Sequence, residues 1–136
     1  MALTEASPRE RNIIAIGSKF KLTLSGTVIA GDLIGYNSGW VRALATVATA
    51  IQTRFVALEG GESGDVIEVA NQAVVSGFTG GTVGNPAYNE EGAGVGGGYT
   101  ETAPSTTGDV DTVIGRIISA TEVLVTPDTR DDSTSA

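Results

Sequence analysis

The chain has 136 residues, which fits one domain, and 40% of them are hydrophobic, enough for a small core. It contains no cysteine and no histidine, which excludes disulfides, Cys/His zinc sites, thiol nucleophiles and imidazole catalysis within this sequence. The net charge is −8, and after Phe55 only Arg116 and Arg130 oppose a large excess of Asp and Glu. Because an acidic body repels phosphate, we expect no nucleic-acid partner.

Residues 1–11 are polar and hold Pro8, Arg9 and Arg11, a composition that predicts a flexible N-terminal arm. With Lys19 and Lys21 they form a basic start to an otherwise acidic chain. Such an arm is either a frayed terminus or a segment that orders on an acidic groove of a partner. The first 12 residues lack the apolar region of a signal peptide, and no apolar run approaches the ~20 residues of a membrane span. We therefore expect synthesis in the cytoplasm and no membrane contact.

The first half of the chain predicts short strands. Residues 19–24 alternate strictly between polar and apolar, which is typical of a half-buried strand. Residues 12–16, 27–30, 33–36 and 40–42 are also strand-like, and Gly-containing turns separate several of them. Residues 44–51, LATVATAI, leave two alternatives open: an extended segment, favoured by the β-branched Thr and Val residues, or one helix, which the Ala content permits.

The second half has a clearer pattern. Strands are predicted at 55–58, 65–70, 73–76, 87–89, 110–120 and 123–126, residues 90–108 form a long Gly-rich loop, and residues 128–136 form a disordered tail. Strands at short intervals without recurrent helices predict an all-β fold, a small β-sandwich or barrel. The predicted organisation is therefore an arm (1–11), a β-domain (12–127) and a tail (128–136).

Two motifs could indicate a ligand, and in both the structural interpretation is favoured. Residues 92–97 match G-x-G-x-x-G, but they lie in a loop after Glu90 and Glu91 with no helix to follow, so a loop tip is expected instead of a dinucleotide site. Glu59, Glu62 and Asp65 surround a Gly-rich turn that could hold calcium, but their spacing does not match an EF-hand loop. We expect no metal and no cofactor.

Catalytic constellations are absent from the sequence pattern. No pair of carboxylates is marked by its surroundings as an acid–base pair, and Ser63 lacks both a nucleophile elbow and a histidine base. The sequence therefore predicts a protein that is not an enzyme.

The aromatic residues offer a possible sugar-binding platform. Tyr36, Trp40, Tyr88 and Tyr99 could form one, although Trp40 beside Tyr36 more often caps a core. Tyr99, in the Gly-rich loop, is the aromatic residue expected to be exposed. With Glu90 and Glu91 it defines a candidate recognition loop.

Four segments of the sequence share a strand-and-turn pattern: GDLIG (31–35), VALEGGESGDVIEVANQAVV (56–75), GTVGNPAYN (81–89) and the region 113–127 with VIGRIISA and VLVTP. In these segments the chain resembles the bacteriophage capsid cement proteins, or head decoration proteins, of the small β-domain type. The resemblance spans roughly residues 26–127. The chain departs from the family in its longer basic arm and in the Gly-rich insertion at 90–108.

The resemblance implies a non-enzymatic protein that binds the outer surface of the assembled virion head, contacts the major capsid protein, forms a homotrimer and stabilises the shell. Arg9, Arg11, Lys19 and Lys21 are then the expected capsid-binding residues. Two alternatives stay open. One is a head-fibre or host-adhesion module that binds surface glycans through Tyr99 and the 90–108 loop, and the other is a tail structural domain of the same β class.

Overall fold

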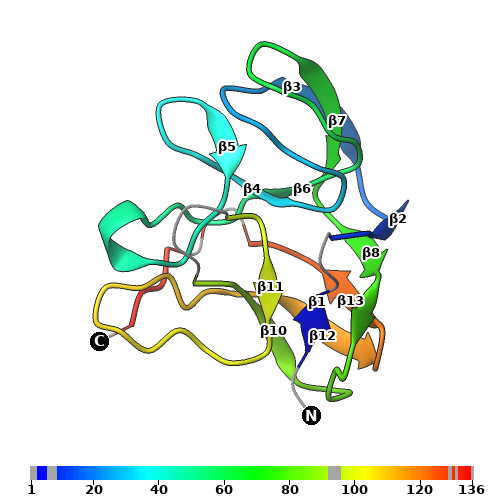
Figure 1. Ribbon diagram of the computed structural model, residues 1–136, viewed down its shortest axis with the longest axis vertical. Helices are drawn as coiled ribbons and strands as arrows, with labels where there is room; N and C mark the ends of the chain where they lie inside the picture. Colours follow the sequence, from blue (N-terminus) through cyan, green and yellow to red (C-terminus); the bar gives the residue numbers. More distant parts are fainter. Residues whose placement is uncertain (1–2, 6–8, 92–95, 129, 131, 136) are drawn as a thin grey trace.

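The computed structural model describes residues 3–5, 9–91, 96–128, 130 and 132–135. Within these ranges the chain folds into three antiparallel sheets with one turn of 3-10 helix, which confirms the all-β, sandwich-like prediction (Figure 1). The strands are β1 (Thr4–Glu5), β2 (Asn12–Ala15), β3 (Lys19–Thr23), β4 (Leu33–Tyr36), β5 (Trp40–Arg42), β6 (Phe55–Ala57), β7 (Val66–Ala70), β8 (Ala73–Ser76), β9 (Phe78–Thr79), β10 (Pro86–Asn89), β11 (Tyr99–Thr100), β12 (Val113–Ser119) and β13 (Glu122–Val125). None of the described residues belongs to a helix that could cross a membrane.

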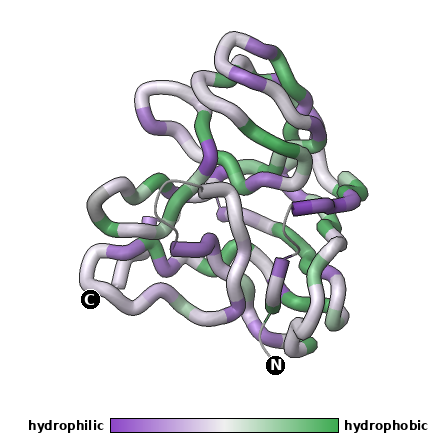
Figure 2. The backbone as a smooth tube through the Cα atoms, in the orientation of Figure 1, coloured by the Kyte–Doolittle hydropathy of each residue, from purple (hydrophilic) through white to green (hydrophobic). Residues whose placement is uncertain are grey.

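The main core lies between the two large sheets. The six-stranded sheet has the order β11-β10-β12-β13-β8-β2, and the five-stranded sheet has the order β3-β7-β6-β4-β5. Alternate residues of β8 and β13, such as Val75 and Val123, point inward and pack with Val56 and Ala70 of the five-stranded sheet. The pattern of these strands follows the period of two that a half-buried sheet requires. Figure 2 shows the hydrophobic residues spread over the strands of both sheets.

One long two-stranded ribbon joins the two sheets. β2 pairs with β8, and β3 pairs with β7, so residues 12–23 run antiparallel to residues 66–76 across the corner of the sandwich. Gly17 lies at that corner, where a Cβ atom would meet the Asn71 side-chain oxygen at 2.1 Å. A side chain at Gly17 would have to displace the Asn71 side chain, which packs on this corner of the ribbon.

A second, smaller core fills the far side of the five-stranded sheet. This sheet curls until Leu24, just after β3, meets Trp40 of β5 in a parallel bridge. Leu24, Ile34, Ile67 and Val69 are buried inside the curl, together with Val28 and Ala57. Aromatic side chains close the curl: Phe20 packs on Phe55 at 4.8 Å, Phe55 on Trp40 at 5.4 Å, and Trp40 on Tyr36 at 5.2 Å between ring centroids.

Residues 44–51 follow the extended alternative. Leu44 and Ile51 form an isolated antiparallel bridge, and between them the chain makes a 3-10 turn at Val47–Thr49. The turn has no side-chain cap at Thr46, consistent with the missing cap signal in the sequence.

Both ends of the chain differ from the prediction. Among residues 3–5 and 9–11, Leu3 is buried in the main core, β1 pairs with β9, and Arg11 is enclosed, so these residues are part of the domain instead of a flexible arm. Near the C-terminus, Thr134 bridges Val110 and the Ser135 hydroxyl donates to the Pro104 carbonyl, so the described tail residues 132–135 pack on the domain. At these described residues the polar sequence did not reveal the long-range pairing. Residues 1–2, 6–8, 129, 131 and 136 of the predicted arm and tail lie outside the described part of the chain.

Candidate functional site

The most elaborate polar arrangement is an ionic cluster beneath the N-terminal segment. Its centre is Asp32, directly before β4, and the Asp32 side chain is fully buried. One Asp32 oxygen accepts from Nη1 of Arg11 at 2.6 Å, and the other accepts from Nε of Arg42 at 2.6 Å and from the backbone N–H of Ile29 at 2.9 Å. Asp32 thus ties the N-terminal segment to the five-stranded sheet.

Glu5 extends this cluster. Its two oxygens accept from Nη2 of Arg11 at 3.0 and 2.9 Å, and one of them also lies 2.9 Å from Nε of Arg9. Arg9 Nη1 in turn donates to the Gly96 carbonyl at 2.8 Å. Only 1% of the Arg11 side chain is exposed, and its guanidinium lies over the Tyr99 ring at 5.2 Å. The N-terminal segment is therefore held by charge as well as by the burial of Leu3.

Charges in the cluster balance. Arg9, Arg11 and Arg42 face Glu5, Asp32 and Glu90, the last 3.5 Å from Arg9. Burial raises the pKa of Glu90, and the charge of Arg9 opposes that shift. The desolvation cost of buried ions offsets much of their attraction. Such a cluster therefore fixes where the N-terminal segment lies more than it stabilises the fold. The cluster contains no nucleophile, and its acids and bases are paired with one another. Its role is to hold the N-terminal segment in place.

The structure separates the four basic residues predicted to bind a partner. Arg9 and Arg11 are engaged in the ionic cluster, whereas Lys19 and Lys21 lie on β3 and are exposed, Lys19 with 54% of its side chain. Sequence reasoning did not identify Asp32, the residue that engages Arg11. The available signal was an acidic residue directly after the Gly31 turn, at the start of an apolar strand.

The structure places the residues of the candidate recognition loop differently from one another. Tyr99 was expected to be exposed, and this is wrong: it is 2% exposed, packs on Phe78 and donates from its hydroxyl to the Gly31 carbonyl at 2.5 Å. Burial raises its pKa far above the ordinary tyrosine value. The prediction failed because Tyr99 begins β11, a strand too short for the sequence pattern to show.

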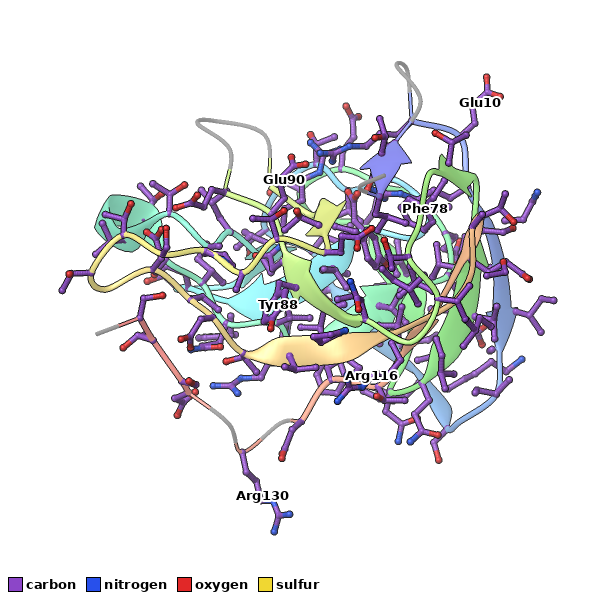
Figure 3. The ribbon with its side chains drawn as sticks, turned by 90° about the horizontal axis from the view of Figure 1, so that it is seen from below. Glu10, Phe78, Tyr88, Glu90, Arg116 and Arg130 are labelled. Atoms are coloured by element: carbon purple, nitrogen blue, oxygen red, sulfur yellow. The ribbon has the colours of Figure 1, made fainter. Side chains whose placement is uncertain are left out.

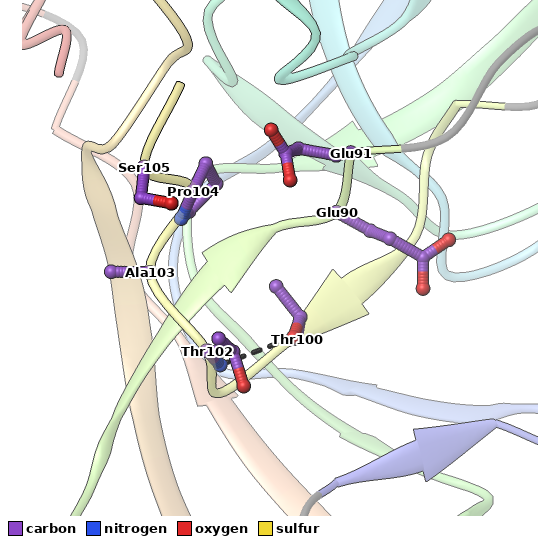
Figure 4. Close-up of a pocket in the computed structure, with 7 residues that line it drawn as sticks. All are labelled: Glu90, Glu91, Thr100, Thr102, Ala103, Pro104 and Ser105. Carbon is purple, nitrogen blue, oxygen red and sulfur yellow. Dashed lines mark hydrogen bonds between the residues drawn. The ribbon is translucent and has the colours of Figure 1, made fainter. Parts of the chain in front are cut away.

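Glu90 and Glu91 lie beside an open pocket of about 170 Å³. Its other lining residues are Thr100, Thr102, Ala103, Pro104 and Ser105 (Figure 4). The Thr102 N–H donates to the Thr100 hydroxyl at 3.1 Å, so a hydrogen bond within the pocket wall orients the Thr100 side chain. Of the G-x-G-x-x-G residues, 92–95 lie outside the described part of the chain.

The other sequence candidates have structural roles. The Asp65 carboxylate accepts from the Glu62 N–H at 2.9 Å, and that of Glu59 accepts from the Glu68 N–H at 3.0 Å, so these acids stabilise turns. The described residues contain no cluster of three or more metal-ligating side chains. Tyr36 and Trp40 belong to the aromatic closure of the smaller core, and Tyr88 lies on β10 (Figure 3).

A second surface feature is the outer face of the six-stranded sheet. The strand register places Ile14, Val74, Leu124, Arg116 and Pro86 in one row across five strands. Ile14 is 65% exposed, and the Arg116 side chain projects from the same sheet (Figure 3). Beside the row, Ile16, Val113 and Ile118 are also at least 40% exposed. The outer face is thus more apolar than a fully solvated sheet requires.

Comparisons of the chain with family models, with curated proteins and with solved structures find no match.

Proposed function

We propose that this chain is a structural protein of a bacteriophage head, one that binds the outer surface of the assembled shell and stabilises it. The observation that carries the proposal is the resemblance of residues 56–75, 81–89 and 113–127 to head decoration proteins. In the fold these segments contain β6, β7, β8, β10, β12 and β13, which are the framework of both large sheets.

The character of the domain supports this role. The described parts of both chain ends are pinned to the body, by Leu3, Arg11 and Ser135 among others, which reduces the order that binding would have to impose. A pre-organised domain that binds only the assembled shell stabilises that state by mass action, and many copies add their effects. The row on the outer face of the six-stranded sheet, apolar except for Arg116, provides surface for a partner to cover.

Heads assembled without this chain provide the test. We expect the purified chain to bind them, and the decorated heads to release their DNA at a higher temperature and to survive osmotic shock better. Electron microscopy of the decorated particles would place the chain on the head. Heads that neither bind the chain nor gain resistance contradict the proposal, and density on the tail would favour the tail-domain alternative. The glycan-binding alternative loses its expected aromatic residue, because Tyr99 is buried.

A further inference from the structure

Residues 12–23 form an open edge that spans both large sheets. β2 is the last strand of the six-stranded sheet and β3 the last of the five-stranded sheet, and only three residues connect them. Among the residues that the structure describes, each pairs on one side alone, β2 with β8 and β3 with β7. We refer to residues 12–23 as the β2–β3 edge.

Backbone hydrogen-bonding groups face outward along this edge. The Ile16 N–H donates to the Gln72 carbonyl at 3.2 Å, and the Leu24 N–H donates to the Asp65 carbonyl at 2.8 Å. Because donors alternate between the two sides of an antiparallel strand, the N–H groups of Ala15 and Lys21 point away from the sheet. The β2–β3 edge therefore presents the pattern that a further strand would complete.

The usual protection of an edge strand is missing on β2. Exposed edges are normally blunted by charged residues, proline or bulges, since they otherwise recruit another strand. β2 has the sequence NIIA, and Ile14 and Ile16 are 65% and 53% exposed. At the other half of the edge, Phe20 of β3 is 37% exposed.

The charge of the edge is opposite to that of the molecule. Between Arg11 and Asp32 the sequence has no acid, and it carries Lys19 and Lys21, whereas the whole chain has a net charge of −8. Glu68 on β7, the cross-strand neighbour of Lys21, lies 4.0 Å from Lys19 at their charged atoms, and Glu10 precedes β2 in the sequence. An acidic segment would be attracted here and repelled by the rest of the body.

We infer that the β2–β3 edge accepts an extended, acidic segment of the capsid subunit as an added strand. This inference rests on the proposed function for the identity of the partner, and it names the contact surface. Backbone hydrogen bonds to the edge would supply affinity, while Ile14, Ile16 and the two lysines would select a segment with alternating apolar and acidic residues. A second copy of this chain is disfavoured, because its own edge carries the same positive charge.

The test compares matched variants on heads assembled without the chain. We expect Ile14→Glu to weaken binding at least about tenfold, and the double variant K19E/K21E to do the same with a smaller salt dependence. Val83→Glu is the matched control for the first, because Val83 is 66% exposed and precedes β10, which three strands separate from β2 in the sheet. Arg130→Glu is the control for charge reversal, since the Arg130 side chain is 91% exposed. Circular dichroism establishes that each variant is folded.

Hydrogen exchange gives a second, independent readout. On binding to heads, the amides of Ala15 and Lys21 should exchange at least about tenfold more slowly, because a new strand would accept from them. If wild-type chain fails to bind heads, the proposed function and this inference both fail. If it binds, but folded edge variants bind equally and the edge amides stay unprotected, the inference alone fails. A change of self-association in Ile14→Glu with unchanged head binding would assign the edge to a second copy and overturn the inference.

Discussion

At the scale of single residues, the fold depends on a few positions at which no other residue type fits. Asp32 is one, because three donors converge on a carboxylate that water does not reach. Gly115 of β12 is another, because a Cβ atom there would lie 2.0 Å from the Leu124 backbone carbonyl oxygen of the neighbouring strand. Moving a flexible side chain can neither replace the Asp32 carboxylate nor make room for a Cβ atom at position 115.

Replacing Asp32 with alanine should destabilise the protein by about 3–5 kcal/mol, because the buried Arg11 would keep only Glu5 and Arg42 would lose the carboxylate it pairs with. Urea unfolding followed by circular dichroism measures the change. Asp128→Ala is the control, since the Asp128 side chain is 54% exposed and should alter stability by less than about 0.5 kcal/mol. Equal stability of the two variants would contradict the role assigned to Asp32.

Gly115→Ala should lower the melting temperature by roughly 10 °C or more, because β12 must separate from β13 to admit the methyl group. Gly26→Ala is the matched control: its added Cβ would lie 3.4 Å from Val41, an ordinary contact. Differential scanning calorimetry compares the two. A melting temperature for Gly115→Ala within about 2 °C of the wild type would show that the strands can separate at little cost.

At the scale of elements, Glu101 fastens the N-terminal segment to the turn before β10. Its carboxylate accepts from the N–H groups of Leu3 at 2.7 Å and Thr82 at 3.1 Å, and from the Asn85 side chain at 3.0 Å. Burial is slight and would raise the pKa of Glu101, but hydrogen bonds from Asn85, Thr82 and Leu3 outweigh it, so the pKa lies below its usual range. The N-terminal segment thus depends on an ionised acid.

This dependence predicts a pH effect. A lowered folded-state pKa contributes stability above the unfolded pKa of about 4.3, and that contribution is lost as the pH falls through the folded value. Glu101→Gln should therefore lower the melting temperature by roughly 4 °C at pH 7, and the difference from wild type should shrink near pH 3. A thermal unfolding series across pH 3–7 measures it. A difference that is constant with pH would mean that the charge of Glu101 does not contribute.

At the scale of the whole molecule, the two cores share one sheet. On β7 of the five-stranded sheet, Ala70 belongs to the main core and its neighbour Val69 to the smaller one, and both are fully buried. β7 and β8 follow each other along the same ribbon, so loss of one core removes support from the other. We therefore treat the chain as one cooperative unit.

Val75→Ala and Val69→Ala should each destabilise the protein by about 2–3 kcal/mol while keeping one unfolding transition. Val66→Ala, at a β7 position that is 58% exposed, should change stability by less than about 0.5 kcal/mol. Fluorescence of Trp40, at the smaller core, and far-ultraviolet circular dichroism should give coincident curves. Separate transitions for the two probes would show that the cores unfold independently.

The sequence by itself determined the class of the fold and many of its strands. Period-two alternation and Gly-rich turns are local signals, so β3, β7, β8 and β13 could be located from them. The absence of cysteine and histidine likewise follows from composition alone.

Only the tertiary structure decided what the polar ends and the charged residues do. Arg11 and Asp32 are 21 positions apart and Glu5 and Tyr99 are 94 apart, so no local pattern links them. Short strands such as β1 and β11 form because a partner strand is present, not because their own residues favour them. Burial and pairing depend on the chain's long-range path, and for this reason Arg11 and Tyr99 are enclosed while Lys19 and Lys21 remain at an open edge.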